Sequence, residues 1–304
     1  MSSLFLIESP LQLLNAYEAD NYFKSKNNKY IIRLSNIKIN DNQILKLIEF
    51  LSIKEKSFII EINSKHKKLR DFLKLLSLKI YIFFVQKKFD KVFVGNIESG
   101  LFSFLTKNIN RKKKILLDDG TKSLVVQKKF TDTYNIDFFS FYDLKPYKNQ
   151  TIYKNNFTKL KETLLCNSLE NQTLLLGAKL SEISIIEEGY YIDLIKKISN
   201  YFKNEILVYI PHRGENRDKL EKIQSEVKNI KIQYIDYPVE LYGLNENINI
   251  KTVISFYSTA LYTMMKIYHC ESISVKFNYN KSEHKKEIDE VYNYYKKYMK
   301  VINL

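Results

Sequence analysis

Short apolar segments alternate with longer amphipathic segments along most of the chain, and no other feature constrains the fold as strongly. The apolar segments have the length and composition of buried strands, and the amphipathic segments carry apolar residues at helical spacing. Strands that alternate with helices over short connections form a parallel sheet with right-handed crossovers. In the first half, the expected strands are residues 3–7, 30–34, 57–62, 91–94 and 114–117. The expected helices are one that Ser9 caps and Pro10 opens, and residues 42–51, 65–78 and 99–107.

The alternation fades between residues 130 and 161, a stretch rich in Tyr, Asn, Lys and Asp that suggests a connection between domains. It then resumes, with expected strands 173–176, 205–210, 231–235, 252–256 and 272–277. The expected helices of this second series are residues 187–202, 215–228, 260–268 and 285–301. The sequence therefore predicts an α/β fold with two Rossmann-like domains, residues 1–150 and 151–304, that face each other across a cleft. Among glycosyltransferases this arrangement is called GT-B.

The chain is strongly basic, with a formal net charge of +15 over 304 residues. Such a charge is compatible with nucleic acid, an anionic membrane surface or acidic small molecules as partners. Nucleic acid is the least favoured of these, because no known nucleic-acid-binding module is present and the aromatic residues do not follow a basic stripe. A basic nucleic-acid-binding protein is still the alternative from a different functional class.

The two cysteines, Cys166 and Cys270, lie far apart without metal-type spacing, so neither a disulfide framework nor a zinc cluster is expected. The N-terminus lacks the basic and apolar regions of a signal peptide. No apolar run approaches the ~20 residues of a membrane span. We therefore expect a cytoplasmic protein that contacts the inner face of the cytoplasmic membrane peripherally, through basic runs attracted to anionic lipids.

The clearest candidate for a binding site follows the expected strand 205–210, in the sequence Pro211-His212-Arg213-Gly214-Glu215. Ligands of open α/β sheets bind outside the carboxyl ends of the strands. His212 and Arg213 also precede a helix N-terminus, where backbone N–H groups and the helix dipole favour an anion. We expect these two side chains to bind a phosphate ester. A solvated strand end with an ordinary capping turn is the competing interpretation.

Other strand ends carry further candidates. Asp118 and Asp119 follow strand 114–117, and their carboxylates could act as a general base or hold a metal, although a plain Asp-Gly turn at Gly120 is the commoner meaning. Ser258 and Thr259 follow strand 252–256 and could cap a helix or cradle a phosphate.

Two glutamates are further candidates outside these motifs. Glu182, just past strand 173–176, is a candidate carboxylate in the cleft. Glu240 lies in an expected loop and could accept hydrogen bonds from a ribose or a base, or simply face solvent.

Five motifs occur in the order found in a known family. They are Ser9-Pro10-Leu11-Gln12, Leu117-Asp118-Asp119-Gly120-Thr121, Leu176-Gly177-Ala178, Tyr209-Ile210-Pro211-His212-Arg213 and Phe256-Tyr257-Ser258-Thr259-Ala260-Leu261. This ordered set resembles the bacterial sialyltransferases of glycosyltransferase family 52, which act on lipooligosaccharide. The chain departs from the usual Pro-His-Pro-Arg of that family, because Arg213 directly follows His212.

The resemblance implies an inverting, metal-independent transfer of sialic acid from CMP-sialic acid to a hydroxyl of a lipooligosaccharide or capsule glycan, with no cofactor. In this interpretation His212 stabilises the phosphate of the leaving CMP, and Asp118 or Glu182 is the general base. The expected substrate-binding residues are Gln12, Asp119, Gly120, Gly177, Arg213, Glu240, Ser258 and Thr259. The expected partners are the CMP-sugar donor, an oligosaccharide or glycolipid acceptor, and a second copy in a homodimer. Transfer of another nonulosonic acid or another nucleotide-activated sugar, and a non-catalytic glycan-binding role, are alternatives on the same scaffold.

Overall fold

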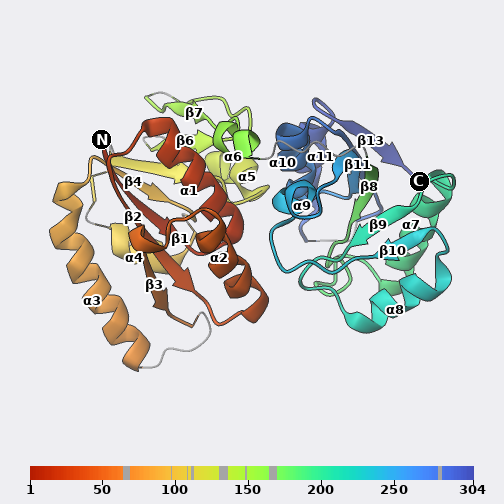
Figure 1. Ribbon diagram of the computed structural model, residues 1–304, viewed down its shortest axis with the longest axis horizontal. Coiled ribbons are helices and arrows are strands. Elements are labelled where there is room, and N and C mark those ends of the chain that lie inside the picture. The colour runs from red at the N-terminus through yellow and green to blue at the C-terminus, as the bar shows by residue number, and fades with distance from the viewer. Residues whose placement is uncertain are drawn as a thin grey trace. The chain divides into compact units, whose positions relative to one another are not determined.

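The computed structural model describes residues 1–63, 69–96, 98–107, 109–110, 113–129, 136–147, 149–163, 170–279 and 283–304 (Figure 1). The chain forms two compact units, and each contains a parallel sheet with helices on its faces. The first unit is Met1–Leu160 with Asp236–Pro238, and the second is Lys161–Ile235 with Val239–Leu304. The predicted fold class, two parallel-sheet α/β domains, is confirmed. The units divide after Leu160, whereas the sequence predicts domains 1–150 and 151–304.

The described residues of the first unit form a seven-stranded sheet with the order β3-β2-β1-β4-β5-β6-β7. The strands are β1 (Ser2–Ile7), β2 (Asn27–Leu34), β3 (Ser57–Glu61), β4 (Lys91–Val94), β5 (Lys114–Leu117), β6 (Asp137–Ser140) and β7 (Ile152–Lys154). The helices are α1 (Pro10–Phe23), α2 (Lys38–Phe50), α3 (Leu69–Val85), α4 (Gly100–Thr106), α5 (Lys122–Lys129) and α6 (Thr158–Thr163). Short 3₁₀ turns η1 (Lys54–Lys56) and η2 (Gln86–Lys88) precede β3 and follow α3.

The described residues of the second unit form a six-stranded sheet with the order β10-β9-β8-β11-β12-β13. The strands are β8 (Asn171–Leu176), β9 (Leu207–Ile210), β10 (Ile230–Ile232), β11 (Asn249–Ser255), β12 (Glu271–Lys276) and β13 (Lys300–Asn303). The helices are α7 (Glu188–Tyr201), α8 (Arg217–Glu226), α9 (Tyr242–Asn245), α10 (Thr259–Tyr268) and α11 (Lys285–Tyr295), and a 3₁₀ turn, η5 (Val239–Leu241), precedes α9.

The central strands of both sheets are buried on their two faces, as parallel sheets covered by helices require. In β1, Leu4 to Ile7 are fully buried, and in β9 Leu207 and Tyr209 are fully buried. In each unit the strand order reverses beside the first strand, between β1 and β4 and between β8 and β11. Ligands of such sheets bind at this topological switch point, outside the carboxyl ends of the strands.

Three strands differ from the sequence prediction. The stretch 130–161 is predicted to be a connection, but β6 pairs with β5 and β7 pairs with β6, both parallel, in the first sheet. The final helix is predicted to reach residue 301, but α11 ends at Tyr295 and β13 pairs parallel with β12. Each of these strands has only two consecutive apolar residues, against three in β4 and β5, so no apolar run stands out from the sequence.

The predicted helix 65–78 corresponds to α3, whose described part starts at Leu69 and runs to Val85; residues 65–68 lie outside the described residues. Cys166 also lies outside them, and Cys270 is a free, buried cysteine. Within the described ranges, no helix is both long enough and apolar enough to span a membrane.

Candidate active site

Three neighbouring strands of the second sheet bring the predicted phosphate-binding residues to one edge. Strand β8 lies between β9 and β11, and Leu176 at its carboxyl end pairs with Ile210 at the end of β9. Gly177, His212 and Ser258 therefore follow three adjacent strand ends, at the switch point of this unit. The predicted strand-end residues are thus brought together within the second unit.

The His212 ring is held in a defined hydrogen-bonding state. Its Nδ1 accepts the backbone N–H of Gly214 at 3.0 Å. Burial, together with the positive charges of Arg213 and Lys179, lowers the pKa of His212 from 6.5 to about 4. A neutral imidazole carries one proton, and because Nδ1 accepts, that proton is on Nε2. At neutral pH the ring is therefore an uncharged donor beside two cations, an arrangement that suits a phosphate oxygen.

The turn that carries His212 is fixed by a buried carboxylate, Glu215. Its Oε2 accepts the backbone N–H of His212 at 2.7 Å, and its Oε1 accepts the hydroxyl of Tyr209 at 2.7 Å. The ammonium of Lys219, one helical turn further along, lies 2.9 Å from Glu215 Oε1, and neither side chain has any exposed area. Burial raises the pKa of Glu215. The contacts with Lys219 and the hydrogen bonds lower this pKa, but they offset the effect of burial only in part.

The side chain of Glu215 leaves no room for a Cβ atom at residue 177, so this position requires glycine. A Cβ atom at Gly177 would lie 2.0 Å from Glu215 Oε2 and 2.6 Å from the hydroxyl of Tyr209. The backbone N–H of Gly177 donates to the carbonyl of Ile210 at 2.9 Å, which joins the ends of β8 and β9. The glycine therefore lets Glu215 fold back over the strand end.

Glu182, a candidate general base, is part of the same ion-pair cluster. Its carboxylate lies 2.9 Å from the ammonium of Lys219 and accepts the backbone N–H of Asn216, also at 2.9 Å. Burial alone would raise the pKa of Glu182, but these hydrogen bonds outweigh it and the pKa is lowered. A carboxylate with a lowered pKa is a weak base.

The remaining predicted residues of this unit have different roles. Ser258 caps α10, because its side chain accepts the backbone N–H of Ala260 at 3.3 Å, and Thr259 is the first residue of that helix. Arg213 is exposed. Glu240 is buried, and its Oε1 accepts the hydroxyl of Thr263 at 2.9 Å. Burial raises the pKa of Glu240 even though the charge of Arg213 acts in the opposite direction.

The first unit has a second polar cluster at its own switch point, and Gln12 is at its centre. Its amide nitrogen donates to Asp119 Oδ1 at 2.8 Å, and its amide oxygen accepts the backbone N–H of Glu8 at 2.9 Å. Gln12 passes directly over Gly95 at the end of β4, where a Cβ atom would lie 2.2 Å from its Oε1. Gln12 itself is 1% exposed, so it positions Asp119 rather than facing solvent.

Glu8 binds three neighbouring side chains beside this cluster. Its carboxylate accepts hydrogen bonds from Arg33 at 2.8 Å, Asn96 at 3.0 Å and Ser99 at 3.1 Å. The ends of β1, β2 and β4 are joined in this way.

The two predicted acids of the Asp-Asp-Gly motif lie in different environments. Asp118 is fully buried, and its oxygens accept the hydroxyl of Ser140 at 2.9 Å and the backbone N–H of Phe141 at 2.7 Å. Burial raises the pKa of Asp118 to about 7. Asp119 is half-buried and lines a small pocket with Gly95, and burial raises its pKa as well. Gly120 completes the turn with a φ of 70°, which favours glycine.

Four residues of these clusters have no assigned role in the sequence prediction: Glu8, Lys179, Glu215 and Lys219. The spacing of Glu215 and Lys219, four residues apart across a helix start, is a signal for an ion pair. Glu8 and Lys179 follow strand ends, but nothing in the sequence shows what they contact. Within the described ranges, no group of three or more His, Cys, Asp or Glu side chains is placed to hold a metal ion.

Comparison with solved structures identifies the fold. Methanocaldococcus jannaschii UDP-GlcNAc 2-epimerase, in complex with UDP-GlcNAc and UDP, matches with a TM-score of 0.62 and 12% identity, over 97% of this chain and 92% of that chain. Acinetobacter baumannii MurG matches with a TM-score of 0.52 and 11% identity, over 100% and 86%. Escherichia coli heptosyltransferase WaaC, with ADP-2-deoxy-2-fluoro heptose, matches with a TM-score of 0.50 and 11% identity, over 90% and 88%. These neighbours share the GT-B fold.

Sequence comparison identifies the family. No curated protein matches the chain. The family model for alpha-2,8-polysialyltransferase (POLYST) matches residues 3–276, a range that contains both polar clusters. The chain is therefore a member of the alpha-2,8-polysialyltransferase family, with the GT-B fold of glycosyltransferases.

Proposed function

We propose that the protein transfers sialic acid from CMP-sialic acid to a hydroxyl of a bacterial surface glycan, a lipooligosaccharide or a capsule. The observation that carries this proposal is the state of His212: a neutral ring whose Nε2–H is available to donate, beside Lys179 and Arg213, at the switch point of a sialyltransferase-family chain. Two fold neighbours are described with a bound nucleotide or nucleotide sugar, which supports a nucleotide-activated donor.

The second unit would bind the leaving group. As the bond between the sugar and CMP breaks, negative charge builds up on a single phosphate. His212 Nε2–H, the cations of Arg213 and Lys179, and the N–H groups at the start of α10 are suited to stabilise that charge. CMP carries less charge than a nucleoside diphosphate, so we expect these groups to suffice without a divalent metal.

The first unit would supply the general base, and we assign that role to Asp119. Asp118 has both carboxylate oxygens committed to Ser140 and Phe141 and no exposed area. Glu182 has a lowered pKa because Lys219 binds it. Asp119 is partly accessible, its pKa is raised, and Gln12 fixes its orientation. In the proposed reaction, the acceptor oxygen bonds to the anomeric carbon, the general base takes its proton, and CMP leaves from the opposite face with inversion.

The test is transfer from CMP-sialic acid to labelled glycans that end in galactose or in sialic acid, with and without EDTA. We expect product with at least one acceptor, unchanged by EDTA, and NMR of the new linkage should show inverted configuration. The His212→Ala variant should turn over about two orders of magnitude more slowly, as loss of a transition-state donor does.

The matched control is His284→Ala, since His284 is 57% exposed and lies in the same unit; this variant should keep normal turnover. Normal turnover in His212→Ala would remove the central residue of the proposal. Calorimetric titration with CMP, CDP and UDP separates the remaining alternatives: preference for CDP or UDP would indicate a different nucleotide-activated sugar.

A further inference from the structure

Helix α3 of the first unit is apolar on both of its faces. Its inner side packs into the core of the unit, where Leu78 is 3% exposed and Ile82 is 1% exposed. Its outer side exposes Phe84 at 69%, Phe72 at 57% and Ile80 at 51%. A helix that is hydrophobic all round is normally buried in a core or in lipid. We therefore expect the outer side of α3 to contact an apolar partner.

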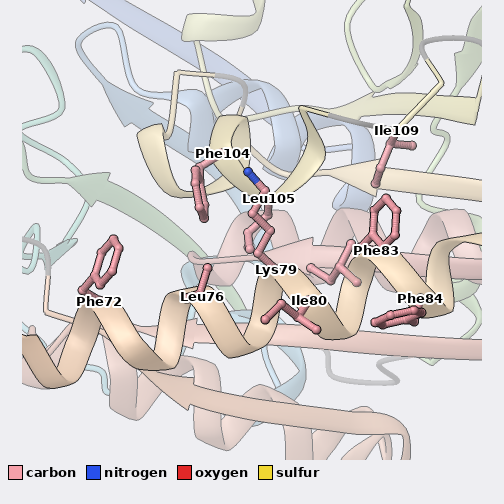
Figure 2. A pocket seen from close by; sticks show the side chains of 10 residues that line it. Phe72, Leu76, Lys79, Ile80, Phe83, Phe84, Phe104, Leu105 and Ile109 are labelled. Atoms are coloured by element: carbon pink, nitrogen blue, oxygen red, sulfur yellow. The ribbon is translucent and has the colours of Figure 1, made fainter.

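The outer side of α3 forms one wall of an open apolar groove (Figure 2). The groove has a volume of about 580 Å³, and Phe104 and Leu105 of α4 line its other wall with Ile109. Its lining side chains are apolar except for Lys79, whose ammonium lies 3.6 Å from the centre of the Phe104 ring.

Lysines flank the exposed apolar side of α3. At 100° per residue, Phe72, Leu73, Leu76, Ile80, Phe83 and Phe84 fall within an arc of roughly 120°. Lys79 falls beside one edge of this arc and Lys74 lies beyond the other. We call these eight residues the α3 surface. Residues 69–88 include five basic side chains, Arg70, Lys74, Lys79, Lys87 and Lys88, and one acid, Asp71.

We propose that the α3 surface binds an anionic lipid bilayer, with α3 lying in the plane of the membrane interface. Phenylalanine and leucine side chains would enter the boundary between headgroups and acyl chains, as they do in interfacial amphipathic helices. The long stems of Lys74 and Lys79 would lie along apolar surface while their ammonium groups reach the lipid phosphates. This orientation is compatible with the packing of α3, because its inner side contacts the protein core and only its outer side would contact lipid.

Charge favours a bilayer over a second copy of the chain. In a symmetric dimer, the same patch of each copy contacts the other, so the lysines of two α3 surfaces would come close together. Within the described part of α3, Asp71 is the one acidic residue that could offset them. A bilayer that contains anionic lipid supplies the apolar layer and the negative charge together.

The test is sedimentation of the full chain with vesicles of phosphatidylcholine alone or of equal parts phosphatidylcholine and phosphatidylglycerol. We expect at least tenfold tighter binding to the anionic vesicles. The double variant Phe72→Ser/Phe84→Ser should bind them at least tenfold more weakly, since two exposed aromatic rings no longer enter the bilayer. The double variant Lys74→Gln/Lys79→Gln should lose a similar factor and most of the preference for anionic lipid.

Matched controls come from the second unit, where Ile206 is 71% exposed and Tyr234 is 66% exposed. The variants Ile206→Ser/Tyr234→Ser and Lys203→Gln/Lys228→Gln should bind vesicles as the parent does. Equal binding by the α3 and control variants would overturn the proposal, as would no binding to anionic vesicles. A dimer in sedimentation velocity that dissociates in Phe72→Ser/Phe84→Ser would show instead that α3 is a contact between copies. None of these measurements depends on transferase activity.

Discussion

At the scale of single residues, Asp118 and Asp119 show that neighbouring acids can have unrelated tasks. The side chain of Asp118 turns into the sheet and ties the end of β5 to Ser140, the last residue of β6, and to Phe141, which follows it. The side chain of Asp119 turns toward Gln12 and the small pocket beside Gly95. A sequence motif cannot distinguish them, because which acid is buried depends on β6, a strand that the sequence does not predict.

This difference predicts opposite outcomes for two conservative substitutions. Asp119→Asn should lower turnover by about two orders of magnitude or more, because an amide cannot accept the acceptor proton. Asp118→Asn should keep most of the turnover, since an amide can still accept from the N–H of Phe141 and donate to Ser140. Transfer rates at saturating donor, with CMP affinity as the control for folding, would test the pair. Loss of turnover in Asp118→Asn with CMP binding intact would restore Asp118 as the base.

The stability of Asp118→Asn should also depend on pH in a defined direction. The folded protein holds Asp118 with a pKa of about 7 against 3.8 for an ordinary aspartate. A raised pKa means that Asp118 contributes stability at low pH and loses it as pH rises from 3.8 through about 7. The asparagine variant lacks this titration. As the pH rises through this range, the melting temperature of Asp118→Asn should therefore increase relative to that of the parent protein.

At the scale of helices and strands, the sequence predicts most strands of both sheets. Strands β4 and β5 have the predicted bounds, and Ser9 and Ser258 cap the predicted helices. Strands β6, β7 and β13 are missed because each contains only two consecutive apolar residues, whereas β4 and β5 contain three. The strand-end motifs indicate that His212 and Gly177 lie near each other, because the carboxyl ends of parallel strands meet at one edge of the sheet. The burial of the Glu215–Lys219 ion pair depends on how α8 packs against the sheet, and the motif carries no information on that packing.

The junction of β8 with the His212 turn can be tested through its glycine. Gly177→Ala places a Cβ where the carboxylate of Glu215 now lies, so Glu215 must move and release the N–H of His212. We expect a loss of about 1–3 kcal/mol in the free energy of unfolding and weaker CMP binding. The matched control is Gly189→Ala in α7, where no atom lies within 4 Å of the added Cβ. Denaturant titration and calorimetry should show the control unchanged or slightly more stable, and equal behaviour of both variants would contradict the role given to Glu215.

At the scale of the whole molecule, the net charge of +15 bears on the choice of acceptor. A glycan that ends in sialic acid carries a carboxylate at each such residue, whereas one that ends in galactose is neutral there. A strongly basic protein attracts a polyanion at long range. Dissolved salt screens this attraction, with a Debye length of about 8 Å at physiological ionic strength. Under the proposed function, this charge would favour a sialylated acceptor over a neutral one.

This charge predicts a salt dependence that separates the two acceptor classes. With a sialylated acceptor, KM should rise several-fold between low and physiological salt, while kcat stays nearly constant because screening acts on encounter rather than on the bond-breaking step. With a galactose-terminated acceptor, KM should change little over the same range. Mixed-sequence DNA is the control polyanion: tight, steeply salt-dependent DNA binding without any sugar transfer would favour the nucleic-acid-binding alternative. Equal salt dependence for both glycans would show that the net charge does not select the acceptor, and the choice would then rest on local contacts in the first unit.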